Sequence, residues 1–258
     1  MKLNLWSKTN KTWIDFNEWT ACSGELTVEE LREENRGALC YVGLDLARSS
    51  DLCAVSCLFP KENGSFDVIT YAFLARDLAL RKEKFDRVPY TLWADQDIGL
   101  ILTEGNTVSY EEICRFIKDD LCKMFDVREL CYDRWQMAYL MPLFEKFGLV
   151  NEKTPLIEFS ANPFTMTTPI LELASLIKNG KIRKGTDNTL LDWQIGHCEL
   201  RTKGVSGEFR QLYKGNQVNR IDNIWALVAA LGRYLVAPPV EKEIEEEAVD
   251  WKSAFSFA

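Results

Sequence analysis

Three aspartates could together support metal-dependent chemistry: Asp45, Asp133 and Asp222. Each lies within or beside an apolar run that is typical of a buried strand or helix. A buried acid without a partner costs several kcal/mol, so such groups are normally paired, hydrogen-bonded or bound to a metal. Carboxylate oxygens suit magnesium or manganese, and two such ions about 4 Å apart can activate water and stabilise the leaving oxygen in phosphodiester hydrolysis.

Spacing alone leaves a plainer alternative open. Any α/β protein carries acids at the ends of its strands, and Asp45 could face solvent at the open end of its strand. Three acids brought together without basic neighbours would repel one another unless divalent cations neutralise them.

The remaining reactive residue types argue against other catalytic classes. The chain has a single histidine, His197, which disfavours Ser-His-Asp, Cys-His and histidine-rich metal sites. Its eight cysteines form no CxxC pair, and several fall within apolar runs, where free cysteine behaves as a small hydrophobic residue. We therefore expect reduced, structural cysteines.

The length is typical of a globular protein, and the negative net charge is not evenly spread along the chain. The 258 residues carry a net charge of −8, and residues 241–258 contribute −4 of it with six acids and two bases. Local patches therefore matter more than the sum. No stretch approaches the roughly 20 apolar residues of a membrane span, and the N-terminus has no apolar core of signal-peptide type, so we expect a protein of the cytoplasm with no membrane partner.

The elements that must position the acids can be predicted from their periodicity. Three strands are expected at 38–47, 52–60 and 65–75, and the turn with Asn63-Gly64 favours an antiparallel hairpin between the last two. An amphipathic helix is predicted over 109–125, with Ser109 and Glu112 forming a capping box.

The second half of the chain alternates strands with helices. We expect strands at 127–133 and 155–160, helices near 27–34, 136–147, 167–179 and 190–200, a loop-rich basic stretch at 201–220, and a last helix at 221–237. This order predicts an α/β fold: a mixed sheet flanked by helices, with the strand arrangement of the ribonuclease H-like fold, although the pattern alone also permits other α/β folds.

Two basic stretches could bind a phosphate backbone. The first precedes Asp222 and contains Arg201, Lys203, Arg210, Lys214 and Arg220. The second surrounds a turn at 178–184. Contacts of this kind give affinity for nucleic acid with little sequence information, whereas an ordinary solvated loop is the alternative.

Several motifs in order resemble the nuclease domain of the large terminase subunit of tailed bacteriophages. They are LNLWSKTNKTWIDFNEWTAC, YVGLDLARSSDLCAV, YTLWADQDIGLILTEGNTVSYEEI, LCYDRWQMAYL and NRIDNIWALVAALGR, which span nearly the whole chain. The resemblance implies an endonuclease that cuts concatemeric duplex DNA during genome packaging. It also implies two magnesium or manganese ions, duplex DNA as substrate, and a terminase ATPase motor, a small terminase subunit and a portal as partners in the bacterial host cytoplasm.

The family's catalytic and metal-binding acids match Asp45, Asp133 and Asp222. Asp51 matches a further acid of the opening motif and is expected to be an accessory metal or water ligand, or equally a cap on the turn between strands. Trp135 follows the family pattern and is expected to orient the Asp133 loop by packing rather than to take a direct role.

The resemblance divides the chain into three parts. Residues 1–37 resemble the connector from the motor side, residues 38–238 are the ribonuclease H-like nuclease domain, and the acidic residues 239–258 are expected to be disordered. No phosphate-binding GxxxxGK[ST] motif occurs, so we interpret the chain as a nuclease half without its ATPase motor. The alternatives are a Holliday-junction resolvase or integrase-like nuclease of the same fold, and a non-catalytic docking module.

Overall fold

A computed structural model of the chain describes residues 12–46, 51–96, 98–134, 140–216 and 219–239. Within these ranges seven strands form one mixed sheet in the order β4-β3-β2-β1-β5-β6, with β7 paired to β3. The strands are β1 (Leu39–Leu46), β2 (Cys53–Pro60), β3 (Phe66–Ala75), β4 (Leu100–Thr103), β5 (Asp126–Tyr132), β6 (Leu156–Glu158) and β7 (Ile182–Lys184).

The three predicted N-terminal strands are confirmed, as is the antiparallel hairpin between β2 and β3. β1 pairs antiparallel with β2, whereas β5 runs parallel to β1 and β6 runs parallel to β5. Parallel neighbours at β1, β5 and β6 bring their carboxyl ends to one edge of the sheet. This is the mixed α/β sheet that the sequence predicts.

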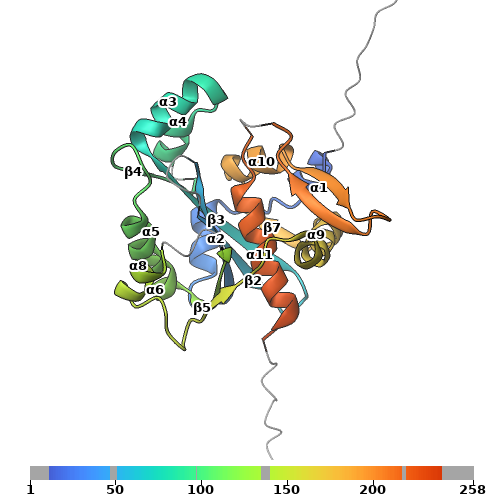
Figure 1. Cartoon of the computed structure of the whole chain (residues 1–258). Helices are drawn as coiled ribbons and strands as arrows, with labels where there is room; N and C mark the ends of the chain where they lie inside the picture. Colours follow the sequence, from blue (N-terminus) through green and yellow to red (C-terminus); the bar gives the residue numbers. More distant parts are fainter. Residues whose placement is uncertain (1–11, 47–50, 97, 135–139, 217–218, 240–258) are drawn as a thin grey trace, which may run out of the picture.

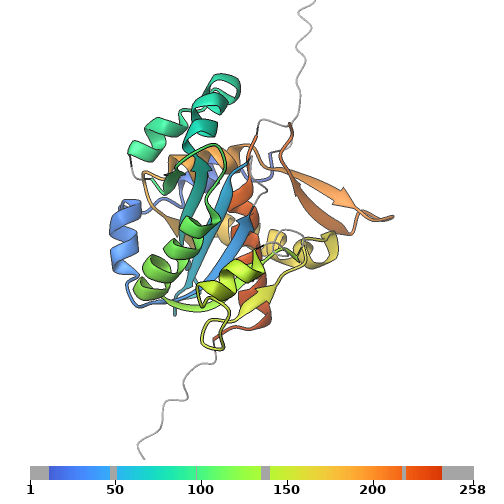
Figure 2. The same cartoon turned by 60° about the vertical axis from the view of Figure 1, so that its left-hand side comes forward.

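Helices cover both faces of this sheet (Figures 1 and 2). One face packs against α2 (Val28–Glu34), α5 (Tyr110–Phe116), a π-helical turn (Ile117–Leu121), α6 (Cys122–Met124) and α8 (Met141–Lys146). The other packs against α1 (Phe16–Thr20), α9 (Pro163–Lys178), α10 (Thr189–Gly196) and α11 (Asp222–Val236).

A third apolar cluster lies at the end of β3. It joins α3 (Arg76–Asp86) and α4 (Tyr90–Asp95) to the sheet through buried residues such as Tyr90 and Trp93. The sequence did not predict these two helices or strand β4, because α3 is rich in charge and carries only a weak apolar stripe.

The helix at 109–125 is confirmed, with a π-helical middle that keeps Ile117 and Leu121 buried. Ser109 Oγ accepts a hydrogen bond from the Glu112 amide, as predicted. The reciprocal half of the predicted capping box is replaced, because the Ser109 amide donates to Thr103 Oγ1. A complete capping box forms instead at α2, between Thr27 and Glu30.

The basic stretch at 201–220 is not simply a loop. Its first half forms an antiparallel hairpin of β8 (Glu199–Lys203) and β9 (Phe209–Tyr213), which projects from the body of the molecule (Figure 2). Gly204 and Gly207 both have positive φ in the turn, which explains how so short a connection reverses the chain.

The described part of the N-terminal segment packs closely on the sheet and its helices. Trp19 is fully buried and donates a hydrogen bond from its indole nitrogen to Asp192, and Leu31 of α2 is fully buried as well. Some sequence predictions lie outside the described residues: the packing of Trp135, the start of the helix at 136–147, and nearly all of the tail at 239–258. Among the helices of the described ranges, none is both long and apolar enough to cross a membrane.

Candidate active site

Asp45 lies near the carboxyl end of β1, on the face that packs against α11. Strand residues alternate between faces, so Tyr41, Gly43 and Asp45 share this face, while the residues between them point to the other core. The Asp45 side chain is part-buried. This placement turns the carboxylate toward a helix while leaving it reachable from solvent.

Asp133 lies beside Asp45 because β1 and β5 are parallel neighbours. The last residues paired between the two strands are Leu44 and Tyr132; Asp45 follows Leu44 within β1, and Asp133 directly follows the end of β5. The two carboxylates therefore lie at the same level of adjacent parallel strands. The structure brings this pair of acids together near the carboxyl edge of the sheet.

Helix α11 crosses β1 at unusually close range, and Gly43 makes this possible. A Cβ atom at position 43 would lie 1.8 Å from the backbone oxygen of Ala226. Only glycine lets the helix backbone approach the strand so closely. The first turn of α11 is thereby held over the side of β1 that carries Asp45.

A buried polar network fixes the start of α11. Asn223 is fully buried; its side chain donates to the backbone oxygen of Tyr71 at 2.8 Å, and its own backbone oxygen accepts from Ser56 Oγ at 2.8 Å. Gln194 of α10 pairs with Asn223 twice, each time at 2.8 Å. These bonds tie the residue after Asp222 to β2, β3 and α10, because an unsatisfied buried amide would be costly.

Asp222 is the first residue of α11 and has an unusual environment. Its Oδ2 atom is buried and has no hydrogen-bond partner among the described residues. Burial and, to a smaller extent, the nearby negative charge of Asp51 raise the pKa of this carboxyl to about 6, against the opposite effects of its own backbone amide, Arg220 and Lys214. An orphaned buried carboxylate oxygen is a group that a bound cation would satisfy.

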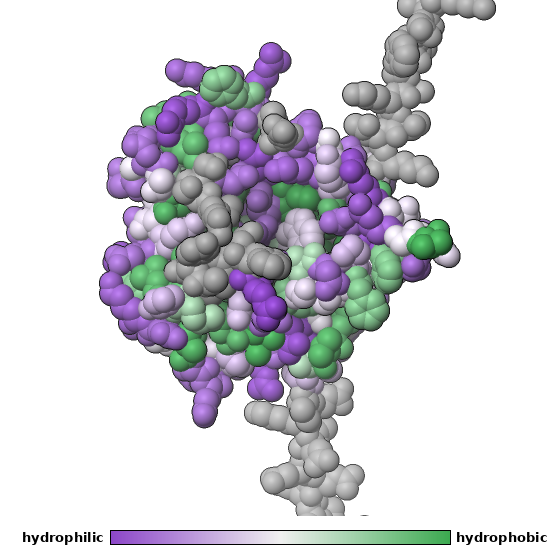
Figure 3. All heavy atoms as spheres, viewed as in Figure 1, coloured by the Kyte–Doolittle hydropathy of each residue, from purple (hydrophilic) through white to green (hydrophobic). Residues whose placement is uncertain are grey.

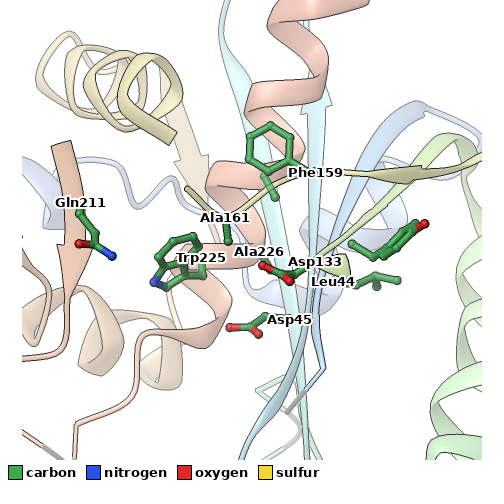
Figure 4. Close-up of a pocket in the computed structure, with 10 residues that line it drawn as sticks. Leu44, Asp45, Asp133, Phe159, Ala161, Gln211, Trp225 and Ala226 are labelled. Carbon is green, nitrogen blue, oxygen red and sulfur yellow. The ribbon is translucent and has the colours of Figure 1, made fainter. Parts of the chain in front are cut away.

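A pocket of about 280 Å³ opens at this edge of the sheet. Both Asp45 and Asp133 line it, together with Trp225, Gln211 of β9 and a further six residues (Leu44, Tyr132, Phe159, Ala161, Ala226 and Ala229). Figure 4 shows the two carboxyl groups pointing toward the side on which Trp225 and Gln211 lie. Neither Trp225 nor Gln211 was predicted from the sequence. Trp225 could have been predicted from its position one helical turn after Asp222.

The three predicted acids are brought to one region but not into one finished cluster. Asp222 does not line the pocket, although Trp225 and Ala226, three and four residues later on the same helix face, do so. Within the described ranges, no group of three His, Cys, Asp or Glu side chains is arranged to hold a metal ion. The donor chemistry fits a hard divalent cation at Asp45 and Asp133, and the buried Oδ2 of Asp222 fits a third ligand.

Asp51 is engaged in ion pairs. Its Oδ1 lies 2.5 Å from Arg220 Nε and 4.0 Å from Lys82 Nζ, and it also accepts from the Leu52 amide at 3.1 Å. Arg220 is only 5% exposed, so it is not placed to contact a phosphate backbone as the sequence suggested.

The other four cations of the predicted DNA-binding set lie on or next to the β8–β9 hairpin. Arg201 and Lys203 are exposed on β8, and Arg210 and Lys214 are half-buried on and just after β9. The Arg201 guanidinium stacks 3.2 Å from the ring centroid of Tyr213. Because Gln211 of the same hairpin lines the pocket, these cations stand at the side of the acidic site.

Two of the four cations of the second basic stretch form internal ion pairs. Arg183 binds Asp67 through two nitrogens at 2.7 Å each, and Lys184 is 1% exposed and bonds to Asp192 at 2.8 Å. This stretch therefore offers fewer cations to a ligand than its sequence indicates. On the face of the molecule in Figure 3, hydrophilic side chains dominate over α3, whereas the surface over α9 and the hairpin is mixed.

The mixed sheet, the two acids ending parallel strands and the helix crossing them define a ribonuclease H-like nuclease fold. A sequence model of the family described as "Terminase large subunit, endonuclease domain" matches residues 1–237. The chain belongs to this family, which confirms the resemblance found in its motifs.

Two relatives and one solved structure are similar to the chain. It is 27% identical over 235 residues to the large terminase subunit of Enterobacteria phage HK97, covering 90% of this chain and 43% of that protein. It is 24% identical over 243 residues to protein YmfN of Escherichia coli K12, covering 91% of this chain and 51% of that protein. The crystal structure of the HK97 large terminase superposes with a TM-score of 0.71 and 26% identity, over 85% of this chain and 43% of that chain. The chain thus spans about half the length of the curated relatives it matches.

Proposed function

We propose that this chain is a divalent-metal-dependent endonuclease that hydrolyses phosphodiester bonds of duplex DNA. The observation that carries the proposal is the pairing of Asp45 and Asp133 at the ends of adjacent parallel strands, in a pocket beside the start of α11. Membership of the terminase endonuclease family supports the same activity.

Each acid has a defined part in the proposed reaction. Asp45, Asp133 and Asp222 would hold magnesium or manganese ions, which supply activation of a water molecule and stabilisation of the leaving oxygen. Asp45 and Asp133 face the pocket, where the scissile phosphate would enter. Asp222 approaches from α11, and its buried Oδ2 would gain the partner that it lacks.

Cations beside the pocket would hold the DNA. Arg201, Lys203, Arg210 and Lys214 lie on one hairpin, where contacts to phosphates would give affinity without base readout. Arg220 is left out of this set because its ion pairs bury it. The proposed substrate is therefore duplex DNA cut with little sequence preference.

The proposed biological role follows the family. Cutting would act on concatemeric DNA at the start and end of genome packaging, with an ATPase motor, a small terminase subunit and a portal as partners. The relative that supports this role, the HK97 large terminase subunit, is about twice as long as this chain.

Plasmid cleavage tests the proposal. Supercoiled plasmid should be nicked and linearised in manganese or magnesium and left intact in chelator. Asp45→Asn and Asp133→Asn should each abolish cutting, while Asp95→Asn, which changes an exposed acid of α4, should cut as wild type does.

Two outcomes would replace the proposal. A strong preference for a four-way junction over linear duplex would favour a junction resolvase of the same fold. Undiminished cutting by both Asn variants, or none by the wild type with any divalent metal, would remove the proposed site; the second result would favour a docking module.

A further inference from the structure

Arg220 joins three segments that meet at the beginning of α11. Its Nε lies 2.5 Å from Asp51 Oδ1 and its Nη2 lies 3.7 Å from Asp86 Oδ2. Asp51 stands just before β2, Asp86 is the last residue of α3, and Arg220 stands two residues before Asp222. One guanidinium thus bridges two carboxylates from separate elements.

Two of the three side chains of the bridge are buried. Those of Arg220 and Asp86 are only 6% and 7% exposed, whereas that of Asp51 is 31% exposed. Tyr90 donates from its hydroxyl to Asp86 Oδ2 at 3.0 Å, and the Leu52 amide donates to Asp51. Both acids are therefore held in place by further bonds, so the guanidinium meets fixed partners. A planar guanidinium suits this double contact better than a lysine ammonium does.

Helix α11 lacks the usual device for fixing its first turn. Ile221 occupies the N-cap position, and no side chain caps the helix there. Without such a cap the amides of the first turn need other partners, and the Asn223 amide finds one in Gln194 Oε1 at 2.8 Å. Asn223 anchors the helix on the side of β2, β3 and α10, and the Arg220 bridge lies on the side of α3.

We propose that Arg220 is a positioning residue whose bridge to Asp51 and Asp86 holds Asp222 in place for metal binding. This inference rests on the proposed function for its metal-binding part only. Asp51, on this view, acts through Arg220 and not as a metal ligand. Arg220 likewise acts on the site by fixing the chain that carries Asp222 and does not touch DNA.

The chain offers a matched control at the other end of the same helix. Arg233 of α11 bonds to Glu129 of β5 at 2.7 Å, with a side chain 20% exposed. Arg233→Gln removes a comparable ion pair far from Asp222. It should therefore cost stability without affecting the site.

Hydrogen exchange in chelator tests the positioning directly, without metal or DNA. In Arg220→Gln the amides at the start of α11 should exchange several-fold faster than in wild type, while those of the last turn stay as protected as before. Arg233→Gln should produce the opposite distribution. Equal protection of the first turn in Arg220→Gln and wild type would overturn the proposal.

Manganese affinity, measured from the electron paramagnetic resonance signal of the free ion, tests the consequence for the site. Arg220→Gln and Asp51→Asn should each weaken binding about 10–100-fold, as is common when a residue that orients a metal ligand is lost. The double variant should be no weaker than Arg220→Gln alone, because both changes break one bridge. Arg220→Lys, which keeps the charge, should recover part of the affinity and serves as the variant to use if Arg220→Gln does not fold.

The manganese affinities and the exchange rates together distinguish the proposal from its alternatives. Weaker binding in Asp51→Asn with unchanged binding in Arg220→Gln would make Asp51 a metal ligand and overturn the proposal. Unchanged affinity in both variants would reduce the bridge to a purely structural contact and overturn it as well. Wild-type protein that takes up no manganese, but shows the exchange difference, would refute the proposed function while supporting the positioning of α11 by Arg220.

Discussion

Replacing Asp222 by asparagine should stabilise the metal-free protein at neutral pH, even though it removes a proposed metal ligand. Burial raises the pKa of the folded-state carboxyl to about 6, compared with an ordinary value of 3.8. Between these two values the folded protein binds a proton that the unfolded chain has released. Stability contributed by this group therefore falls as the pH rises from about 4 to about 6 and remains reduced above that range.

The size of the effect follows from the two pKa values. Each pKa unit corresponds to about 1.4 kcal/mol, so ionised Asp222 costs the folded state at most about 3 kcal/mol at pH 7.5. For a domain of this size, that equals a rise in Tm of about 6–12 °C when asparagine replaces it. Asparagine has nearly the same shape and stays neutral, so no cavity offsets the gain.

Urea unfolding in chelator at pH 4.0 and pH 7.5 measures this prediction. Asp222→Asn should match wild type at pH 4.0 and exceed it at pH 7.5, while Asp95→Asn should show no difference at either pH. Manganese should then stabilise wild type but not Asp222→Asn. A gain that is the same at both pH values, or a loss at pH 7.5, would refute the reasoning from burial.

Further predictions concern the helix crossing, the DNA path and nucleotides. Gly43→Ala should lower the free energy of unfolding by about 1–3 kcal/mol or more, because the added Cβ would meet the Ala226 backbone oxygen. Gly196→Ala should not lower it, because a Cβ at position 196 would meet open space. Equal stabilities of the two variants in urea unfolding would contradict the close crossing. Replacing Arg210 and Lys214 by alanine should weaken binding to two unrelated duplexes alike and flatten log K against log salt by up to roughly 2 units; fluorescence anisotropy in calcium showing an unchanged slope would move the DNA path elsewhere. ATP hydrolysis should stay at the level of buffer with or without DNA, since the sequence has no P-loop, and turnover that follows the protein through purification would contradict this.

The parts of the fold with strong local signals could be predicted from the sequence. Strands β1 to β3 are long apolar runs, and α11 combines a wide apolar face with a Pro-Pro end, so their periodicity identifies them. Strand β7 could not be foreseen in the same way. It has three residues, two of them cations, and Lys184 is buried there because Asp192 and Ser23 from other segments satisfy it.

In the candidate site, too, some residues could be predicted from the sequence and others could not. Asp45, Asp133 and Asp222 could be named because each stands beside an apolar run and matches a family motif. The role of Arg220 could not, because a cation in a polar stretch gives no sign that it is buried against Asp51 and Asp86. Pairing between segments more than a hundred residues apart is set by the tertiary fold and not by local sequence.

Anomalous diffraction from wild-type crystals soaked in manganese tests the proposed metal site most directly. We expect anomalous density at the pocket edge, with carboxylate oxygens of Asp45 and Asp133 as ligands and Asp222 Oδ2 turned toward it, and we expect that density to be lost in Asp45→Asn. Density confined to other acids, or a pocket without any ion at saturating manganese, would contradict the metal-dependent mechanism.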